Sequence, residues 1–177
     1  NKNDWYFIYT DSSSASTTAE GTVSIGAGAI QQDPSEDPLM YVMSSSNCPL
    51  WGMDNRVDRK DRPQFKMKFL YSVIALKIVN ETQGAIVLNN AEIRTEEEIV
   101  GDYNVNISDG ALKYTPVSGN TSKTAEIFLK QSQELNQGGE YTIYLPVRPF
   151  TVKKGSSISI LVNHSIRTMK MDRDIEF

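Results

Sequence analysis

Apolar and polar side chains alternate with a period of two along most of this chain, as expected where successive side chains point to opposite faces of a β-strand. In residues 74–78, for example, Ile74, Leu76 and Ile78 are separated by Ala75 and Lys77. Segments with this alternation, or with a short run of aromatic and β-branched residues, are predicted to be strands. They are residues 5–9, 22–30, 39–43, 65–69, 74–78, 86–93, 103–107, 125–129, 141–145 and 158–162.

Turn signals separate these segments. Residues 80–84 (NETQG) and 153–155 (KKG) predict turns, and Asp-Gly at 109–110 predicts a tight hairpin turn. Residues 71–73 predict a local break, and residues 131–136 predict one helical turn. The pattern contains no long helix and predicts an antiparallel β-sandwich or barrel.

Two long polar segments interrupt the pattern. Residues 11–18 are rich in Ser and Thr and predict a loop, and residues 44–63 predict a longer polar loop. Gly26 and Gly28 lie inside a predicted strand, which indicates a bulge or a close backbone approach. No repeat or shift in composition divides the chain, so we expect residues 1–177 to form a single domain.

Composition narrows the functional classes. The chain has 177 residues, with 18 Lys and Arg against 22 Asp and Glu, for a net charge of -4. This mild acidity without a basic stripe argues against a nucleic-acid partner. Cys48 and His164 are the only residues of their types, which excludes a disulfide within the chain and a zinc site built from several Cys and His ligands.

Candidate chemical groups all have simpler structural interpretations. Asp102, Asn104 and Asn106 resemble the start of a calcium loop, but position six is Ile107 and position twelve is Lys113, where that loop needs Gly and Glu. We therefore interpret them as the solvent face of a strand. The aspartates at positions 54, 58 and 61 alternate with cations and predict a solvated loop.

A catalytic site is not expected. The acidic run 96–98, with Glu126 or Glu134, would need two carboxyl groups held across a cleft, and a charge run between strands is usually solvated. His164 lacks the Gly-x-Ser-x-Gly context of a hydrolase and predicts a surface histidine. We expect no catalytic, metal-binding or cofactor-binding residues.

Trp51 lies in the 44–63 segment beside Pro49 and Gly52. An exposed indole there would stack on a sugar or anchor a protein partner, with Tyr41 or Tyr114 in support. The alternative, which we favour, is that Trp51 folds back to cover one end of the sandwich.

Five segments in order resemble the fimbrillin-like family of Bacteroidales. Residues 37–42 are similar to its D-L-M-x-A strand, residues 69–80 to its F-x-H-x-L segment and long alternating strand, and residues 99–105 to its I-x-G-x-y-x-V strand. Residues 141–149 are similar to Y-x-x-l-l-P-v-x-P, and residues 155–162 to G-x-x-l-x-i-x-V. Tyr71 stands where the family often has His, so any role of that His is lost.

The resemblance implies a Greek-key, transthyretin-like β-sandwich and a structural subunit of a bacterial surface fimbria (type V pilus) or a related cell-adhesion protein. Family members are lipoproteins of the outer membrane that are trimmed by a protease and polymerise by strand exchange. The expected partners are other fimbrial subunits, and a host protein or glycan. The membrane would be reached only through a lipid anchor that this sequence lacks, and the chain would be the N-terminal domain of a longer protein.

Strand exchange requires a sheet edge with unpaired backbone groups beside an open apolar groove. We expect Phe69, Ile74, Leu76 and Ile78 to line this groove, unless they are ordinary core residues. The alternative function is a carbohydrate-binding surface module that uses Trp51.

Overall fold

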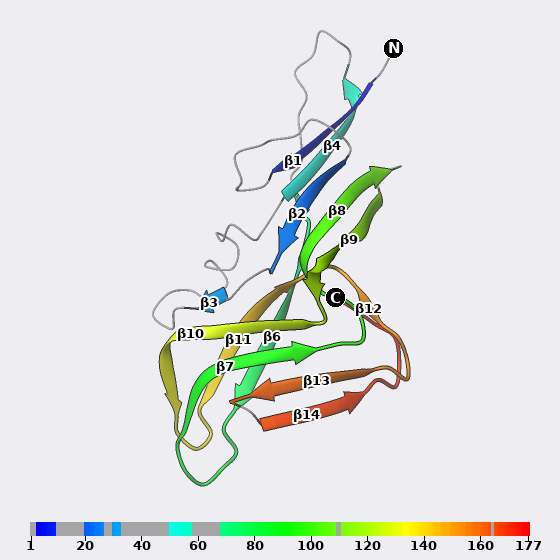
Figure 1. The fold of residues 1–177 in the computed structure, drawn as a ribbon. Helices are drawn as coiled ribbons and strands as arrows, with labels where there is room; N and C mark the ends of the chain where they lie inside the picture. Colours follow the sequence, from blue (N-terminus) through cyan, green and yellow to red (C-terminus); the bar gives the residue numbers. More distant parts are fainter. Residues whose placement is uncertain are drawn as a thin grey trace.

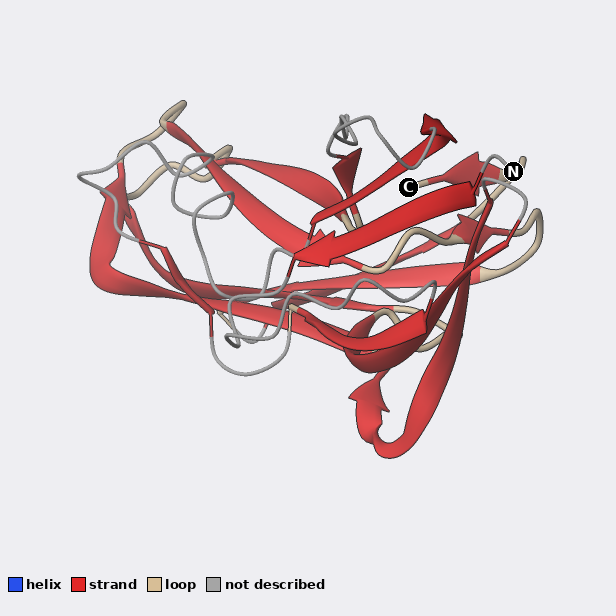
Figure 2. Cartoon of the chain, turned by 90° about the horizontal axis from the view of Figure 1, so that it is seen from above, coloured by secondary structure: helices blue, strands red, loops and turns tan. Residues whose placement is uncertain are grey.

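The computed structural model describes residues 3–9, 20–26, 30–32, 50–57, 68–108, 111–163 and 165–177. All regular elements in these ranges are strands, so this part of the chain has no helix that would cross a membrane (Figure 2). The strands are β1 (Asn3–Tyr9), β2 (Glu20–Ile25), β3 (Ile30–Gln32), β4 (Leu50–Val57), β5 (Lys68–Phe69), β6 (Ser72–Val79), β7 (Ile86–Arg94), β8 (Val100–Ser108), β9 (Ala111–Ser122), β10 (Thr124–Leu135), β11 (Glu140–Val147), β12 (Thr151–Val152), β13 (Ser157–Val162), β14 (Ser165–Lys170) and β15 (Ile175–Glu176).

Two of the sheets enclose the main core. One sheet has the order β14-β13-β7-β10-β3 and the other consists of β11 and β6, and their strands cross at a steep angle (Figure 1). Within the two sheets neighbouring strands are antiparallel, except that β3 runs parallel to β10. Apolar side chains from β7, β10, β11 and β13 form one buried cluster between them. The all-β, largely antiparallel prediction is confirmed, while the Greek-key, transthyretin-like order stays a prediction.

The period of two explains how β11 joins this core. Ile143, Leu145 and Val147 point to the same face of the strand, and each is at most 1% exposed. Burying a side chain of this size contributes about 1.5–3 kcal/mol. The intervening Tyr144 packs against a second apolar cluster on the opposite face, so β11 contributes to both cores.

The second cluster lies under the sheet β2-β8-β9, whose β8–β9 hairpin extends away from the sandwich (Figure 1). Tyr103, Val105 and Ile107 of β8 are at most 2% exposed, and Val23 and Ile25 of β2 pack beside them. Ser108 pairs with Ala111, which agrees with the predicted hairpin, although residues 109–110 themselves lie outside the described residues.

Gly26 confirms the predicted close backbone approach. Its φ is +56°, and a Cβ placed on it would lie 2.4 Å from the carbonyl oxygen of Pro146. Any other residue would therefore be strained and would clash with β11. Gly28 lies outside the described residues.

Two predicted elements differ from the structure. Residues 50–57, predicted as part of a polar loop over 44–63, form β4, because their backbone pairs with both β1 and β5 and pairing overrides weak side-chain propensity. The helical turn predicted at 131–136 is wrong: β10 continues to Leu135 after an irregularity between Phe128 and Gln133. Strands β9, β12, β14 and β15 were not among the predicted strands, and the strand predicted at 39–43 lies outside the described residues.

Candidate functional site

The edge of the two-stranded sheet along β6 is the first candidate site. Ile74, Leu76 and Ile78 face the main core, as an alternating strand requires, but each remains partly exposed. Of their register partners on β11, Ile143 and Leu145 are at most 1% exposed, while Tyr141, opposite Ile78, is partly buried. The core is therefore less well covered beside β6 than beside β11. Within the described part of the chain, β6 pairs with β11 alone.

Phe69 lies apart from these three residues. It belongs to β5, which pairs with β4 in a different sheet, and its side chain is 45% exposed. Its ring makes an edge-on contact with Tyr71, with 5.0 Å between the ring centres. The four residues predicted to line one groove are thus divided between an inward-facing row on β6 and an exposed ring on β5, and their role in strand exchange stays a prediction.

The outer edge of β11, unlike that of β6, is covered by the buried side-chain amide of Gln32. Gln32 of β3 is fully buried, and its Nε2 donates to the Thr142 carbonyl at 3.1 Å and to the Tyr141 hydroxyl at 3.0 Å. Its Oε1 accepts from the Tyr144 N–H at 3.2 Å. This side-chain amide therefore occupies the Thr142 carbonyl and the Tyr144 N–H, two of the backbone groups that an added strand would use.

Asn163 covers part of the edge of β7 in the same way. It has a φ of +45° in the β13–β14 turn, a conformation that Asn tolerates better than most residues. Its side-chain amide donates to the Val87 carbonyl, and its Oδ1 accepts from the Asn89 N–H at 2.9 Å. Sequence analysis missed both amides, because a lone Gln or Asn gives no signal of which backbone it will meet.

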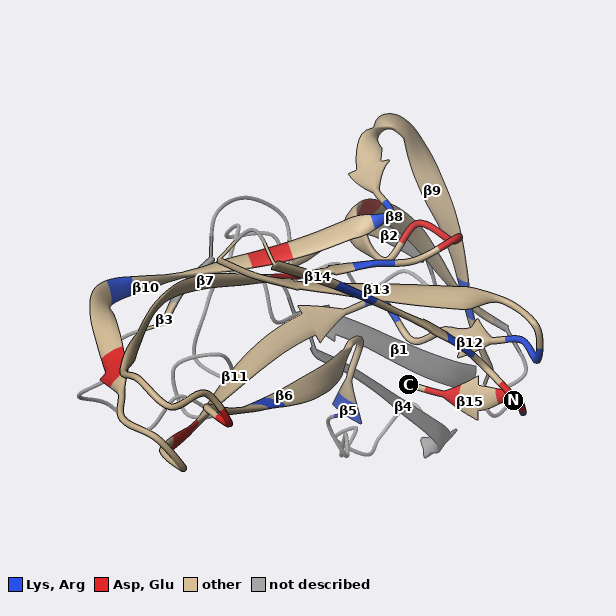
Figure 3. Cartoon of the chain, turned by 90° about the horizontal axis from the view of Figure 1, so that it is seen from below, with Lys and Arg blue, Asp and Glu red and all other residues tan. Residues whose placement is uncertain are grey.

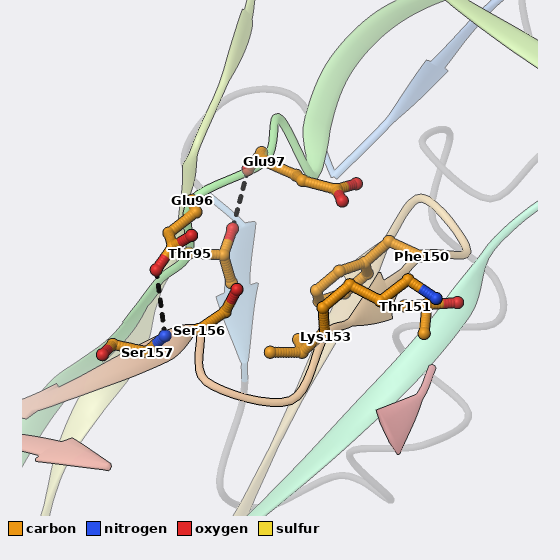
Figure 4. Close-up of a pocket in the computed structure, with 9 residues that line it drawn as sticks. Thr95, Glu96, Glu97, Phe150, Thr151, Lys153, Ser156 and Ser157 are labelled. Atoms are coloured by element: carbon orange, nitrogen blue, oxygen red, sulfur yellow. Dashed lines mark hydrogen bonds between the residues drawn. The ribbon is translucent and has the colours of Figure 1, made fainter. Parts of the chain in front are cut away.

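Glu96 and Glu97 of the acidic run line a small surface pocket (Figure 4). Glu96 accepts a hydrogen bond from the Ser157 N–H at 3.0 Å. Glu97 pairs with Arg148 at 3.1 Å, and the Glu98 carbonyl accepts from the Nε of Arg148 at 3.1 Å. These groups hold the β7–β8 connection against neighbouring strands.

Lys153, the basic residue that lines this pocket, is paired with an acidic side chain. Lys153 Nζ lies 3.0 Å from Asp174, and the backbone N–H of Lys154 donates to the same carboxylate at 2.8 Å. The Lys154 N–H and the Lys153 ammonium hold the pKa of Asp174 below its ordinary value. Among the described residues no group of three or more His, Cys, Asp or Glu could hold a metal ion.

The calcium-like motif lies on the face of β8 opposite its buried residues, which confirms the strand interpretation. Asp102 accepts hydrogen bonds from Ser24 and Asn120, and Asn104 accepts one from Thr22 at 2.7 Å. Asn106 lies further along the same strand. The side-chain oxygens of Asp102 and Asn104 thus accept from side chains of the adjacent strands β2 and β9.

The other candidate carboxylates are scattered. Glu126 accepts a hydrogen bond from Asn90 at 3.2 Å on β7, and Glu134 is exposed near the end of β10. The backbone of Asp54 lies in β4, while Asp58, Asp61, Cys48 and His164 lie outside the described residues.

The sugar-stacking alternative depended on three aromatic residues. Trp51 lies in β4 with its backbone paired to Ile8, and nothing is described of its side chain. Tyr114 packs against the second apolar cluster and does not offer its ring to a ligand. The ring lies edge-on to Tyr103 with 6.3 Å between the ring centres, and the hydroxyl donates to the Leu70 carbonyl at 3.0 Å. Tyr41 lies outside the described residues. The stacking role of Trp51 stays a prediction.

Comparison with known proteins gives little. No protein-family model and no curated protein sequence matches the chain. One solved structure that matches the chain in part is that of a putative cell adhesion protein from Bacteroides ovatus, at 16% sequence identity and a TM-score of 0.49. The match covers 99% of this chain and 59% of that one, so the chain spans about three fifths of the length of its structural neighbour.

Proposed function

We propose that this chain is a non-catalytic building block of a bacterial cell-surface fimbria or adhesin, and that it accepts an extended strand of a neighbouring subunit along the edge of β6. The sequence resemblance to fimbrillin-like proteins suggests the class. The observation that carries the choice of edge is the incomplete burial of Ile74, Leu76 and Ile78 beside a strand for which the described residues provide one paired neighbour.

The backbone of β6 has the orientation that an added strand needs. In an antiparallel pair, directly opposed residues point their N–H and C=O groups either at each other or both away. Thr142 and Tyr144 use theirs on Gln32, away from β6, and Pro146 has no N–H. Their partners across the pair are Lys77, Ala75 and Val73. The backbone groups of these three residues therefore point to the outer edge of β6.

Ala75 offers a way to block this edge without disturbing the fold. Proline at position 75 removes an outward N–H, while the pairing of β6 with β11 does not use that group. Its matched control is Ala75→Val, which also enlarges the side chain but keeps the N–H. We expect both variants to fold, because the side chain of residue 75 is exposed.

The test adds a short peptide that alternates isoleucine with threonine, and uses a peptide of the same composition in scrambled order as its control. Binding to the native state at a hundredfold excess over Kd stabilises it by about 2.7 kcal/mol, which raises Tm by roughly 5–10 °C in a domain of this size. We expect this rise for the wild type and Ala75→Val and its loss in Ala75→Pro. An equal response of Ala75→Pro, or no response of the wild type, would contradict acceptance of a strand at β6.

A further inference from the structure

Strand β14 is the edge strand of the five-stranded sheet at the end opposite β3, and it is exposed on both faces. All six of its residues are exposed, and its paired neighbour is β13. Ile166 is 53% exposed and Met169 is 45% exposed, and their odd spacing places them on opposite faces of the strand. An added strand would therefore find an apolar contact on each face.

The backbone of β14 also points outward at alternate residues. Val162 pairs with Ser165 across a two-residue connection, and such a hairpin closes with a hydrogen bond from the second of these residues to the first. The N–H of Ser165 thus points toward β13. Alternation then directs the N–H and C=O groups of Ile166, Thr168 and Lys170 to the outer edge.

The charge of this edge contrasts with that of the whole chain. The strand contains Arg167 and Lys170 and no acidic residue, whereas the protein has a net charge of -4 (Figure 3). The described residues contain no ion pair to either cation. Pairing two copies of β14 antiparallel about Thr168 would place the two Arg167 side chains diagonally across the pair and put four cations and no acidic residue on the paired strands, which disfavours a second copy as the occupant.

We propose that β14 is a docking edge for an extended, carboxylate-rich segment of a partner protein, which adds a strand beside it. Backbone hydrogen bonds would give the binding, and opposite charge would give the selectivity. Basic residues on an edge also serve to prevent aggregation. A purely protective edge, however, has no need for the large apolar side chains at positions 166 and 169. This site is separate from β6 and does not depend on the function proposed above.

The test uses two fluorescent peptides, one alternating valine with glutamate and the other valine with lysine, titrated against the full chain at low and high salt. We expect the acidic peptide to bind at least about tenfold more tightly than the basic one, with the difference reduced by salt. Thr168→Pro should weaken binding by about tenfold or more through loss of the outward N–H. Thr168→Val keeps that N–H and should bind as the wild type does.

If Thr168→Pro unfolds, a double variant that reverses the charge of the strand, Arg167→Glu with Lys170→Glu, still tests the proposal. We expect this variant to bind the basic peptide more tightly than the acidic one. Ala75→Pro should leave acidic-peptide binding unchanged, which separates this edge from β6. Equal binding of the two peptides, no binding of the acidic one, or no effect of charge reversal would overturn the proposal. A concentration-dependent dimer that Thr168→Pro abolishes would instead assign the edge to a second copy.

Discussion

Tyr114 shows how one side chain anchors the exposed hairpin to the body of the protein. Most residues of β9 are exposed, but the ring of Tyr114 packs on the second cluster and its hydroxyl reaches back to the Leu70 carbonyl. Burial raises the pKa of this phenol to about 12, and the nearby Arg148 opposes the rise only in part. The neutral phenol is therefore the form that the fold requires.

This shift predicts a loss of stability in alkali. The unfolded chain ionises Tyr114 near the ordinary pKa of 10.0 and the folded chain only near a pKa of about 12. Tyr114 therefore stabilises the fold fully below pH ~10, and this contribution falls as the pH rises toward 12. Urea unfolding followed from pH 9 to 12 should show this decline, and Tyr114→Phe should show a shallower one. Equal slopes for the two proteins would contradict it.

At the scale of elements, the short strand β3 closes one side of the sandwich. Its backbone pairs in parallel with β10, while the Gln32 amide binds the edge of β11, so three residues join the two sheets. Replacing this amide by a hydrocarbon would leave the Thr142 carbonyl and the Tyr144 N–H, both part-buried, without protein partners, at about 1–3 kcal/mol each.

Gln32→Leu should accordingly lower the free energy of unfolding by about 2–4 kcal/mol, as measured by urea denaturation. Gln83, an exposed residue of the 80–84 turn, provides the control: Gln83→Leu should change stability by no more than about 0.5 kcal/mol. A loss below about 1 kcal/mol for Gln32→Leu would mean that water replaces the amide at the β11 edge.

The elements that the sequence predicts well are those whose apolar residues alternate. β6, β8 and β11 alternate strictly enough for their location to follow from the pattern. β14 gives no such signal, because neither of its faces is buried and its residues need no alternation. β4 was missed because its strand character comes from pairing with β1 and β5, which are distant in sequence.

The candidate edges were harder to predict than the strands themselves. The alternation of Ile74, Leu76 and Ile78 indicates that they share a face, but not that β11 is their paired neighbour or that they stay partly exposed. The sealing of the other edges depends on Gln32 and Asn163, whose backbone partners lie 74 to 112 residues away in sequence. Contacts of this kind follow from the tertiary structure and not from local pattern.

At the scale of the molecule, Arg148 connects the two apolar clusters. It follows β11, is mostly buried, and binds the Glu98 and Pro149 carbonyls and the Glu97 carboxylate. Its guanidinium also lies 5.7 Å from the ring centre of Tyr103, at the centre of the second cluster. The β7–β8 connection of the sandwich and the sheet β2-β8-β9 are therefore held by the same cation.

Removing this charge should loosen the smaller sheet more than the sandwich. Arg148→Met keeps an apolar stem but removes the hydrogen bonds to Glu97, Glu98 and Pro149, for an expected loss of at least about 2 kcal/mol. Hydrogen exchange should then accelerate in β2, β8 and β9 more than in β7, β10 and β13, because the former share their core with Tyr103. Arg167→Met, which removes an exposed cation, should leave both regions unchanged. Equal acceleration across all six strands would mean that the two clusters unfold as one unit, and that Arg148 stabilises the whole molecule and not the junction between its two parts.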